Sequence, residues 1–148
     1  MYEVEKSIEI WASPEKCFKT ICDFETYPEW QQAIKKVTIL DQDEKNGPTV
    51  VEYELDVFVK TINYTLNYKY EENNSKKFVL KWDYAGGDLK NIEGSYTFEE
   101  AEKGKTLATY SLTLELAAKV PEFILKKLKD KMMTDSMNSL KKRSEDNI

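Results

Sequence analysis

The sequence contains no histidine, and this absence excludes several kinds of chemistry. Catalysis by a histidine acid or base, a serine–histidine pair and a histidine-bound metal are all unavailable to the chain. Cysteine is also scarce, because Cys17 and Cys22 are the two thiols. Two thiols without histidine make a poor structural metal site, and we expect them to be reduced. We therefore predict neither a metal nor another cofactor.

Glycine-rich motifs and long apolar runs are missing as well. Gly86 and Gly87 stand alone, so the chain has no phosphate-binding loop and no dinucleotide fingerprint. No stretch approaches the roughly 18 apolar residues that a membrane-spanning helix needs. Residues 1–5 are acidic and lack the layout of a signal peptide. A cytoplasmic location is therefore expected.

What is present fits one folded domain. The 148 residues are 41% hydrophobic and 33% charged, a balance typical of a chain that buries a full core. Aromatic residues are plentiful, with nine tyrosines, six phenylalanines and three tryptophans. Because aromatic side chains are favoured in strands, this composition favours a sheet-rich fold. We predict a single domain over residues 1–148.

The order of the expected elements indicates the fold class. A strand is predicted over residues 2–11. A helix begins after it at Ser13 and Pro14. A second short turn is expected over residues 24–27, where Pro28 should stop it. About six consecutive strands follow between residues 34 and 116, each alternating apolar and polar side chains. One long helix is predicted from Pro121 to about Arg143. The pattern predicts an α+β protein with an antiparallel sheet that has one wet face.

The terminal helix is the one element long enough to cover the apolar face of this sheet. Ile124, Leu125, Leu128, Met132 and Leu140 form its apolar stripe at three-and-four spacing. Ser136 falls in that stripe where a large residue would be expected, close to flexible methionines. A sheet curled around a single helix with such a gap is expected to enclose a cavity.

Many tyrosines fall on the inward phase of the predicted strands. A core normally uses aliphatic residues and phenylalanine, because a buried hydroxyl needs a hydrogen-bond partner. Inward tyrosines therefore suggest a pocket that orients a ligand, although tyrosines at the rim of the sheet with solvated hydroxyls would give the same pattern. The predicted ligand-binding residues are Tyr53, Tyr64, Tyr68, Trp82, Tyr84, Tyr96 and Tyr110 on the strands, closed by Phe123, Leu128 and Met132 on the helix. No catalytic residue is predicted, because most strand carboxylates fall on the polar phase.

The charge is unevenly distributed. Residues 119–143 hold eight basic and three acidic side chains, a net charge of +5, which leaves −10 on the rest of the chain. Overall acidity argues against DNA binding. The basic residues of the helix, Lys126, Lys127, Lys129, Lys141, Lys142 and Arg143, either form a solvated outer face or meet an anionic membrane or ribosome surface.

Several segments together resemble a known superfamily. They are Ile10 to Phe18, Asp23 to Trp30, Lys81–Trp82, Gly94 to Phe98 and the strand around Thr109–Tyr110. In them the chain resembles the START/Bet v 1-like (SRPBCC) superfamily, and within it the polyketide cyclase/dehydrase and lipid transport branch. The resemblance implies a helix-grip fold, in which a curved antiparallel sheet of about seven strands surrounds a long C-terminal helix and two short helices follow the first strand.

The same resemblance implies a deep pocket between the sheet and the terminal helix. We predict that the pocket binds or transports a small hydrophobic ligand, such as a lipid, a quinone or a polyketide-like molecule. A binding role is favoured over a catalytic one. A cyclase- or dehydratase-like enzyme that uses tyrosine and water is the first alternative. An interaction module that acts through the basic helix on a ribosome or membrane surface is the second.

Overall fold

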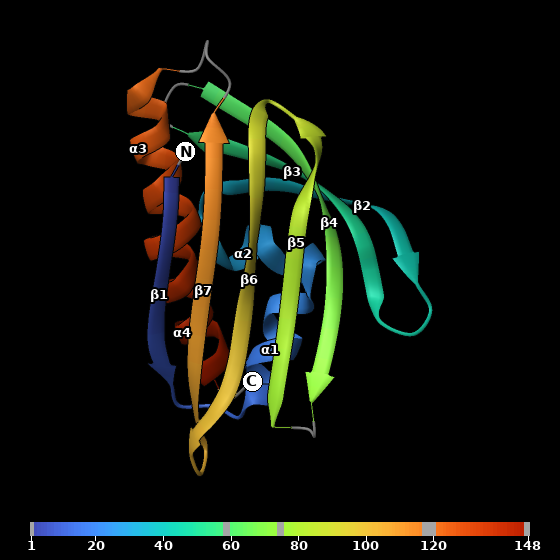
Figure 1. Cartoon of the computed structure of the whole chain (residues 1–148), viewed down its shortest axis with the longest axis vertical. Coiled ribbons are helices and arrows are strands. Elements are labelled where there is room, and N and C mark those ends of the chain that lie inside the picture. The colour runs from blue at the N-terminus through green and yellow to red at the C-terminus, as the bar shows by residue number, and fades with distance from the viewer. Residues whose placement is uncertain (1, 58–59, 74–75, 117–120, 147–148) are drawn as a thin grey trace.

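The computed structural model describes residues 2–57, 60–73, 76–116 and 121–146. Seven strands form one antiparallel sheet in the order β1-β7-β6-β5-β4-β3-β2 (Figure 1). Strands β2 to β7 are therefore consecutive neighbours, and β1 adds at the far edge beside β7. This arrangement confirms the predicted α+β helix-grip architecture. The strand bounds are β1 Tyr2–Ile10, β2 Ile34–Asp43, β3 Gly47–Val57, β4 Lys60–Asn73, β5 Lys77–Gly87, β6 Leu89–Glu102 and β7 Lys105–Leu116.

The short helices follow β1 as predicted, with one difference at Pro28. Helix α1 spans Pro14–Cys22, and the Ser13 hydroxyl caps it by accepting from the Lys16 backbone N–H at 3.2 Å. A 3₁₀ turn, η1, covers Phe24–Thr26, and helix α2 covers Tyr27–Trp30. The prediction that Pro28 stops the second helix is wrong, because Pro28 lies in the first turn of α2. Proline is tolerated there, since the first N–H groups of a helix have no internal partner.

The terminal helix is continuous but changes its winding in the middle. It comprises α3 over Glu122–Lys129, a π-helical segment η2 over Asp130–Asp135, and α4 over Ser136–Glu145. In a π-helix the hydrogen bonds span five residues, so each turn is wider than in an α-helix. The wider turn places Met132 and Met133 both in the interior. The apolar periodicity of the sequence did not indicate this segment.

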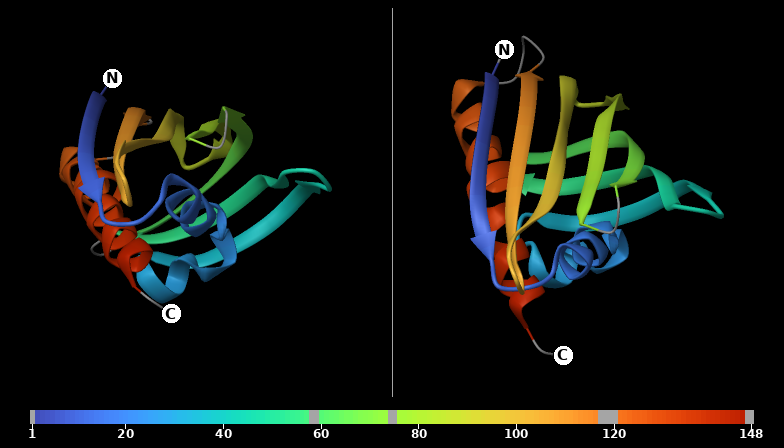
Figure 2. Two further views of the ribbon diagram at one scale, coloured as in Figure 1. Left: turned by 90° about the horizontal axis from the view of Figure 1, so that it is seen from below. Right: turned by 60° about the horizontal axis from the view of Figure 1, so that its bottom comes forward.

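The sheet curves so that the terminal helix runs along its concave side (Figure 2). Ile124 and Leu128 are almost fully buried there, as predicted. Helix α1 packs across the ends of β5, β6 and β7, where the Phe18 ring stacks on Phe78 with centroids 5.0 Å apart. We call Phe18, Phe78 and Phe98 the phenylalanine region. It closes one end of the interior.

A second aromatic cluster fills the interior farther along the same strands. We call its six buried tyrosines the tyrosine region: Tyr27, Tyr53, Tyr64, Tyr68, Tyr96 and Tyr110. Phe24 and Trp82 link their rings into a chain of contacts, which includes the edge-to-face pair of Tyr96 and Tyr110 with centroids 4.5 Å apart. Tyr96 and Tyr110 also face each other across β6 and β7. The tyrosines therefore come together through strand pairing as well as ring packing.

Candidate functional site

The tyrosine region surrounds a cavity. Its volume is about 80 Å³, measured as the space open to the centre of a water molecule. That is several times the roughly 10–15 Å³ that one water needs on the same measure. The interior is therefore not packed solid between the sheet and the terminal helix, and a small molecule has room there.

Seven of the ten predicted ligand-binding residues line this cavity. They are Tyr53, Tyr64, Tyr68, Trp82, Tyr96, Tyr110 and Met132. Strands β3 to β7 carry the aromatic ones on their inward phase, and the π-helical segment carries Met132. Trp82 reaches over β6 because Gly94 faces it with no side chain. A Cβ atom added at Gly94 would lie 2.9 Å from the Trp82 ring.

The other three predicted residues do not line the cavity. The hydroxyl of half-buried Tyr84 donates to the Leu89 carbonyl at 2.6 Å and accepts from the Leu89 N–H at 3.1 Å, which holds it at the end of the strand. Leu128 is fully buried in the core. Phe123, in the first turn of α3, leaves 53% of its surface exposed.

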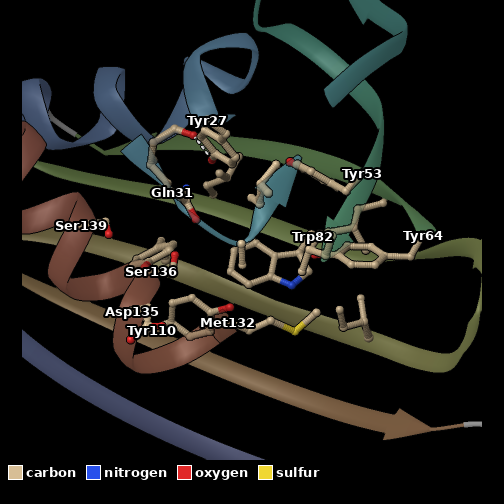
Figure 3. A pocket seen from close by; sticks show the side chains of 18 of the residues that line it. Tyr27, Gln31, Tyr53, Tyr64, Trp82, Tyr110, Met132, Asp135, Ser136 and Ser139 are labelled. Carbon is tan, nitrogen blue, oxygen red and sulfur yellow. Dashed lines mark hydrogen bonds between the residues drawn. The ribbon is translucent and has the colours of Figure 1, made fainter. Parts of the chain in front are cut away.

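The entrance to the cavity was not predicted. Gln31, Gln32 and Ala33, in the link between α2 and β2, line it together with Asp135 and Ser139 on the terminal helix. Figure 3 shows Gln31 facing Ser136 and Ser139 across this side. Gln32 and Asp135 are exposed, so the cavity reaches solvent between the link and the helix. The sequence carried no signal for this, because the residues lie in a short loop and beside an unpredicted π-helical turn.

Some tyrosine hydroxyls of the site are already satisfied within the protein. The Tyr53 and Tyr68 hydroxyls lie 2.6 Å apart in a mutual hydrogen bond. The Tyr27 hydroxyl donates to the Ile21 carbonyl (Figure 3). These bonds explain how three phenols can be buried on the β3–β4 side without a polar ligand.

Burial changes the acid–base behaviour of these phenols. Desolvation raises the pKa values of Tyr27, Tyr53, Tyr68 and Tyr110 well above 10, because the charged phenolate is disfavoured in an apolar interior. The side chains are therefore neutral near pH 7. A neutral phenol donates a hydrogen bond but is a poor general base.

Charged groups are sparse around the cavity. Among the described lining residues, Asp135 is the single carboxylate, and it sits at the exposed entrance. Within the described ranges, no group of three or more Cys, Asp or Glu side chains could hold a metal ion. The strand carboxylates Glu52, Asp56 and Asp83 are exposed on the outer face, as the alternation predicted. In the part of the chain that the structure describes, no helix is both long and apolar enough to cross a membrane.

The basic residues of the terminal helix lie partly in ion pairs. The Lys141 ammonium contacts the Glu145 carboxylate at 2.5 Å and donates to the Glu9 carbonyl at 3.0 Å. Arg143 lies 3.8 Å from Glu29. Lys126 is exposed. A membrane or ribosome surface as partner for this helix stays a prediction.

Comparison with known proteins places this geometry in a family. A family model described as "Polyketide cyclase / dehydrase and lipid transport" matches residues 1–145. No curated protein matches the chain significantly.

Solved structures share the fold at low sequence identity. A START superfamily protein from Mycobacterium smegmatis superposes with a TM-score of 0.83 and 23% identity, over 98% of each chain. The Zhui aromatase/cyclase from Streptomyces sp. R1128 superposes with a TM-score of 0.79 and 14% identity, over 97% of this chain and 93% of that one. A STAR-related lipid transfer protein from Xanthomonas axonopodis superposes with a TM-score of 0.79 and 9% identity, over 97% of this chain and 86% of that one. The chain therefore shares its fold with these proteins, and because the family model matches almost its whole length, it belongs to the polyketide cyclase/dehydrase and lipid transport family.

Proposed function

We propose that the protein binds and carries a small, uncharged apolar molecule in the cavity of the tyrosine region. The observation that carries this proposal is the open space of about 80 Å³, enclosed by aromatic side chains and reaching solvent near Asp135. Burial of an apolar ligand there contributes about 25 cal/mol per Å² before the costs of association. The family's fold is consistent with hydrophobic ligand binding and also with cyclase activity.

The lining favours binding over catalysis. A cyclase needs groups that remove and return protons, and such groups work best with pKa values near the working pH. The buried tyrosines have pKa values raised well away from neutrality, and Asp135 is exposed at the entrance. The described lining thus offers hydrogen-bond donors and apolar surface but no acid–base pair in its interior.

A direct test uses indane, a compact apolar probe without any polar group. In ¹H–¹⁵N NMR spectra of the full chain, indane should shift the indole N–H signal of Trp82 and the amide signals of β5 and β6. Ser136→Phe should fill the cavity and abolish these shifts. Asn138→Phe is the matched control, because Asn138 is exposed on the same helix, and this variant should bind indane like the unmodified protein.

Two outcomes would change the proposal. The proposal would be refuted if the unmodified, folded protein does not bind indane and if native mass spectrometry of protein from its own host detects no bound ligand. Loss of water from a bound polyketide-like compound, seen as a product of lower mass, would favour the enzyme alternative.

Vesicles containing anionic lipid test the interaction alternative. Since Lys141 and Arg143 lie beside acidic groups of the same chain, we expect no pelleting with such vesicles at low salt. Pelleting at low salt that disappears at high salt would instead support a membrane role for the basic helix.

A further inference from the structure

The hydroxyls around the cavity fall into two groups, bonded or not bonded to another described residue, and Tyr64 on β4 belongs to the group that is not bonded. On the β3–β4 side, Tyr53 and Tyr68 hydrogen-bond to each other. On the side where β6 and β7 face the terminal helix, Tyr96, Tyr110 and Ser136 are buried, with exposed fractions of 2%, 6% and 8%. The Tyr96 hydroxyl is fully buried and has no hydrogen-bond partner among the described residues. We call Tyr96, Tyr110 and Ser136 the hydroxyl cluster.

The members of this cluster lie together. Tyr96 and Tyr110 are cross-strand neighbours whose rings meet edge to face at 4.5 Å. The Ser136 side chain is close enough to Tyr96 to lower its pKa relative to the effect of burial alone, although the geometry falls short of a hydrogen bond. The Tyr110 and Ser136 hydroxyls also make no hydrogen bond to a described residue, but unlike the Tyr96 hydroxyl they are not fully enclosed, and both residues line the cavity. Figure 3 shows Ser136 and Tyr110 toward the same end of the cavity, with Tyr53 and Tyr64 at the other.

Buried hydroxyls without partners are rare in folded proteins, because each forfeits the hydrogen bonds it would make in water. The Tyr96 hydroxyl is such a group, and the Tyr110 and Ser136 hydroxyls beside it belong to residues that line the cavity, where a bound acceptor would satisfy them. We infer that the hydroxyl cluster binds a carbonyl or similar uncharged acceptor oxygen of the ligand, which orients the ligand with its apolar body toward Trp82 and Tyr64. This inference rests on the proposed function of the cavity.

The chemistry of the lining decides between an uncharged and a charged polar group. A carboxylate would be buried without a counter-charge, since the described lining contains no lysine or arginine and its one carboxylate, Asp135, would repel it. A carbonyl oxygen accepts two hydrogen bonds, which suits the neutral hydroxyls of Tyr110 and Ser136. The Tyr96 hydroxyl is fully buried, so Tyr96 would act through the neighbouring Ser136 as a positioning residue.

The test compares three probes with one ring system: indane, 1-indanone and indane-1-carboxylate. Each is titrated into the full chain, and its dissociation constant is taken from the NMR shifts. The ketone should bind about three- to ten-fold more tightly than indane, the gain expected for one or two net hydrogen bonds. The carboxylate should bind more weakly than both.

Matched tyrosine variants assign the effect to the cluster. Tyr110→Phe and Ser136→Ala should each remove most of the preference for the ketone while indane still binds. Tyr84→Phe removes a hydroxyl that lies outside the cavity lining and is bonded to Leu89, so it should leave the preference unchanged. Tyr96→Phe should reduce the preference without abolishing it.

The outcomes separate this inference from the proposed function. Equal affinity for indane and 1-indanone, or a preference that survives both Tyr110→Phe and Ser136→Ala, would overturn the role of the hydroxyl cluster and leave the carrier proposal standing. Tighter binding of the carboxylate would also overturn it. Failure of all three probes to bind would remove the proposed function itself.

Discussion

The phenylalanine region and the tyrosine region lie on the same strands but pack differently. Strand β5 carries Phe78 in the phenylalanine region and Trp82 beside the tyrosine region. Strand β6 carries Phe98 in the phenylalanine region and Tyr96 in the tyrosine region. Inward apolar and outward polar side chains alternate in both regions, except that Val79, next to Phe78, is also buried. At Phe78 the rings stack under α1, whereas around Trp82 they surround a cavity of about 80 Å³.

The difference teaches how a core and a binding site can be built from one sheet. Alternation determines which face of a strand is inward but not whether that face is filled. Where the inward residues are phenylalanine and a helix with large side chains covers them, the interior closes. Where they are tyrosine and the covering helix presents Ser136, space and unpaired hydroxyls remain.

The largest effect is expected in the closed part of the core. Leu128→Asp places a charge at a position with no exposed surface, and its desolvation costs several kcal/mol, comparable to the whole stability of a small domain. We expect the variant to be unfolded in circular dichroism and thermal melting. Asn138→Asp, at an exposed site of the same helix, should melt like the unmodified protein. A normal melting temperature for Leu128→Asp would contradict the packing of the helix on the sheet.

The next effect concerns the border between the regions. A methyl group at Gly94 would lie 2.2 Å from the Ser111 carbonyl oxygen and 2.9 Å from the Trp82 ring. Gly94→Ala should therefore lower the free energy of unfolding, measured by urea denaturation, by about 1–3 kcal/mol, because β7 or the Trp82 ring must shift. Ser95→Ala, at the half-buried neighbouring position, should change stability by less than about 0.5 kcal/mol. Equal stability of the two variants would mean that Trp82 does not pack over β6.

Alkaline pH should act strongly on the tyrosine region, in addition to its effect on Cys17, Cys22 and Tyr70, whose pKa values burial also raises. The folded-state pKa values of its tyrosines are raised, so the folded protein keeps phenolic protons that the unfolded chain loses above about pH 10. Stability is then fully present below pH 10 and falls above it, by up to about 1.4 kcal/mol per pH unit for each such tyrosine. Absorbance at 295 nm should show these phenols ionising together with unfolding. Ionisation of all nine tyrosines near pH 10 in a still folded protein would contradict their burial.

The smallest effect distinguishes bonded from unbonded hydroxyls within the tyrosine region. Tyr53→Phe leaves the Tyr68 hydroxyl without its partner and should cost about 1 kcal/mol in chemical denaturation. Tyr110→Phe breaks no hydrogen bond to a described residue, so its free energy of unfolding should stay within about 0.5 kcal/mol of that of the unmodified protein. Similar losses in both variants would show that the two groups of hydroxyls do not differ.

Much of the fold could be predicted because it depends on local pattern. The two-residue period of the strands, the cap at Ser13 and the apolar stripe of the terminal helix each indicate a secondary structure and its buried face. The order of these elements then favours consecutive antiparallel neighbours. Six predicted ligand-binding residues line the cavity for the same reason, since strand phase turned them inward, and Met132 was predicted from the apolar stripe of the helix.

The remainder depends on contacts between distant segments. The π-helical turn, the entrance beside Gln31, and the exclusion of Tyr84, Leu128 and Phe123 from the lining are not visible in any local period. The sequence by itself determined the elements and their inward faces, because side-chain direction follows from backbone geometry. Only the tertiary structure decided which inward side chains meet a partner and which face open space, because that depends on how tightly the helix and the curved sheet approach each other.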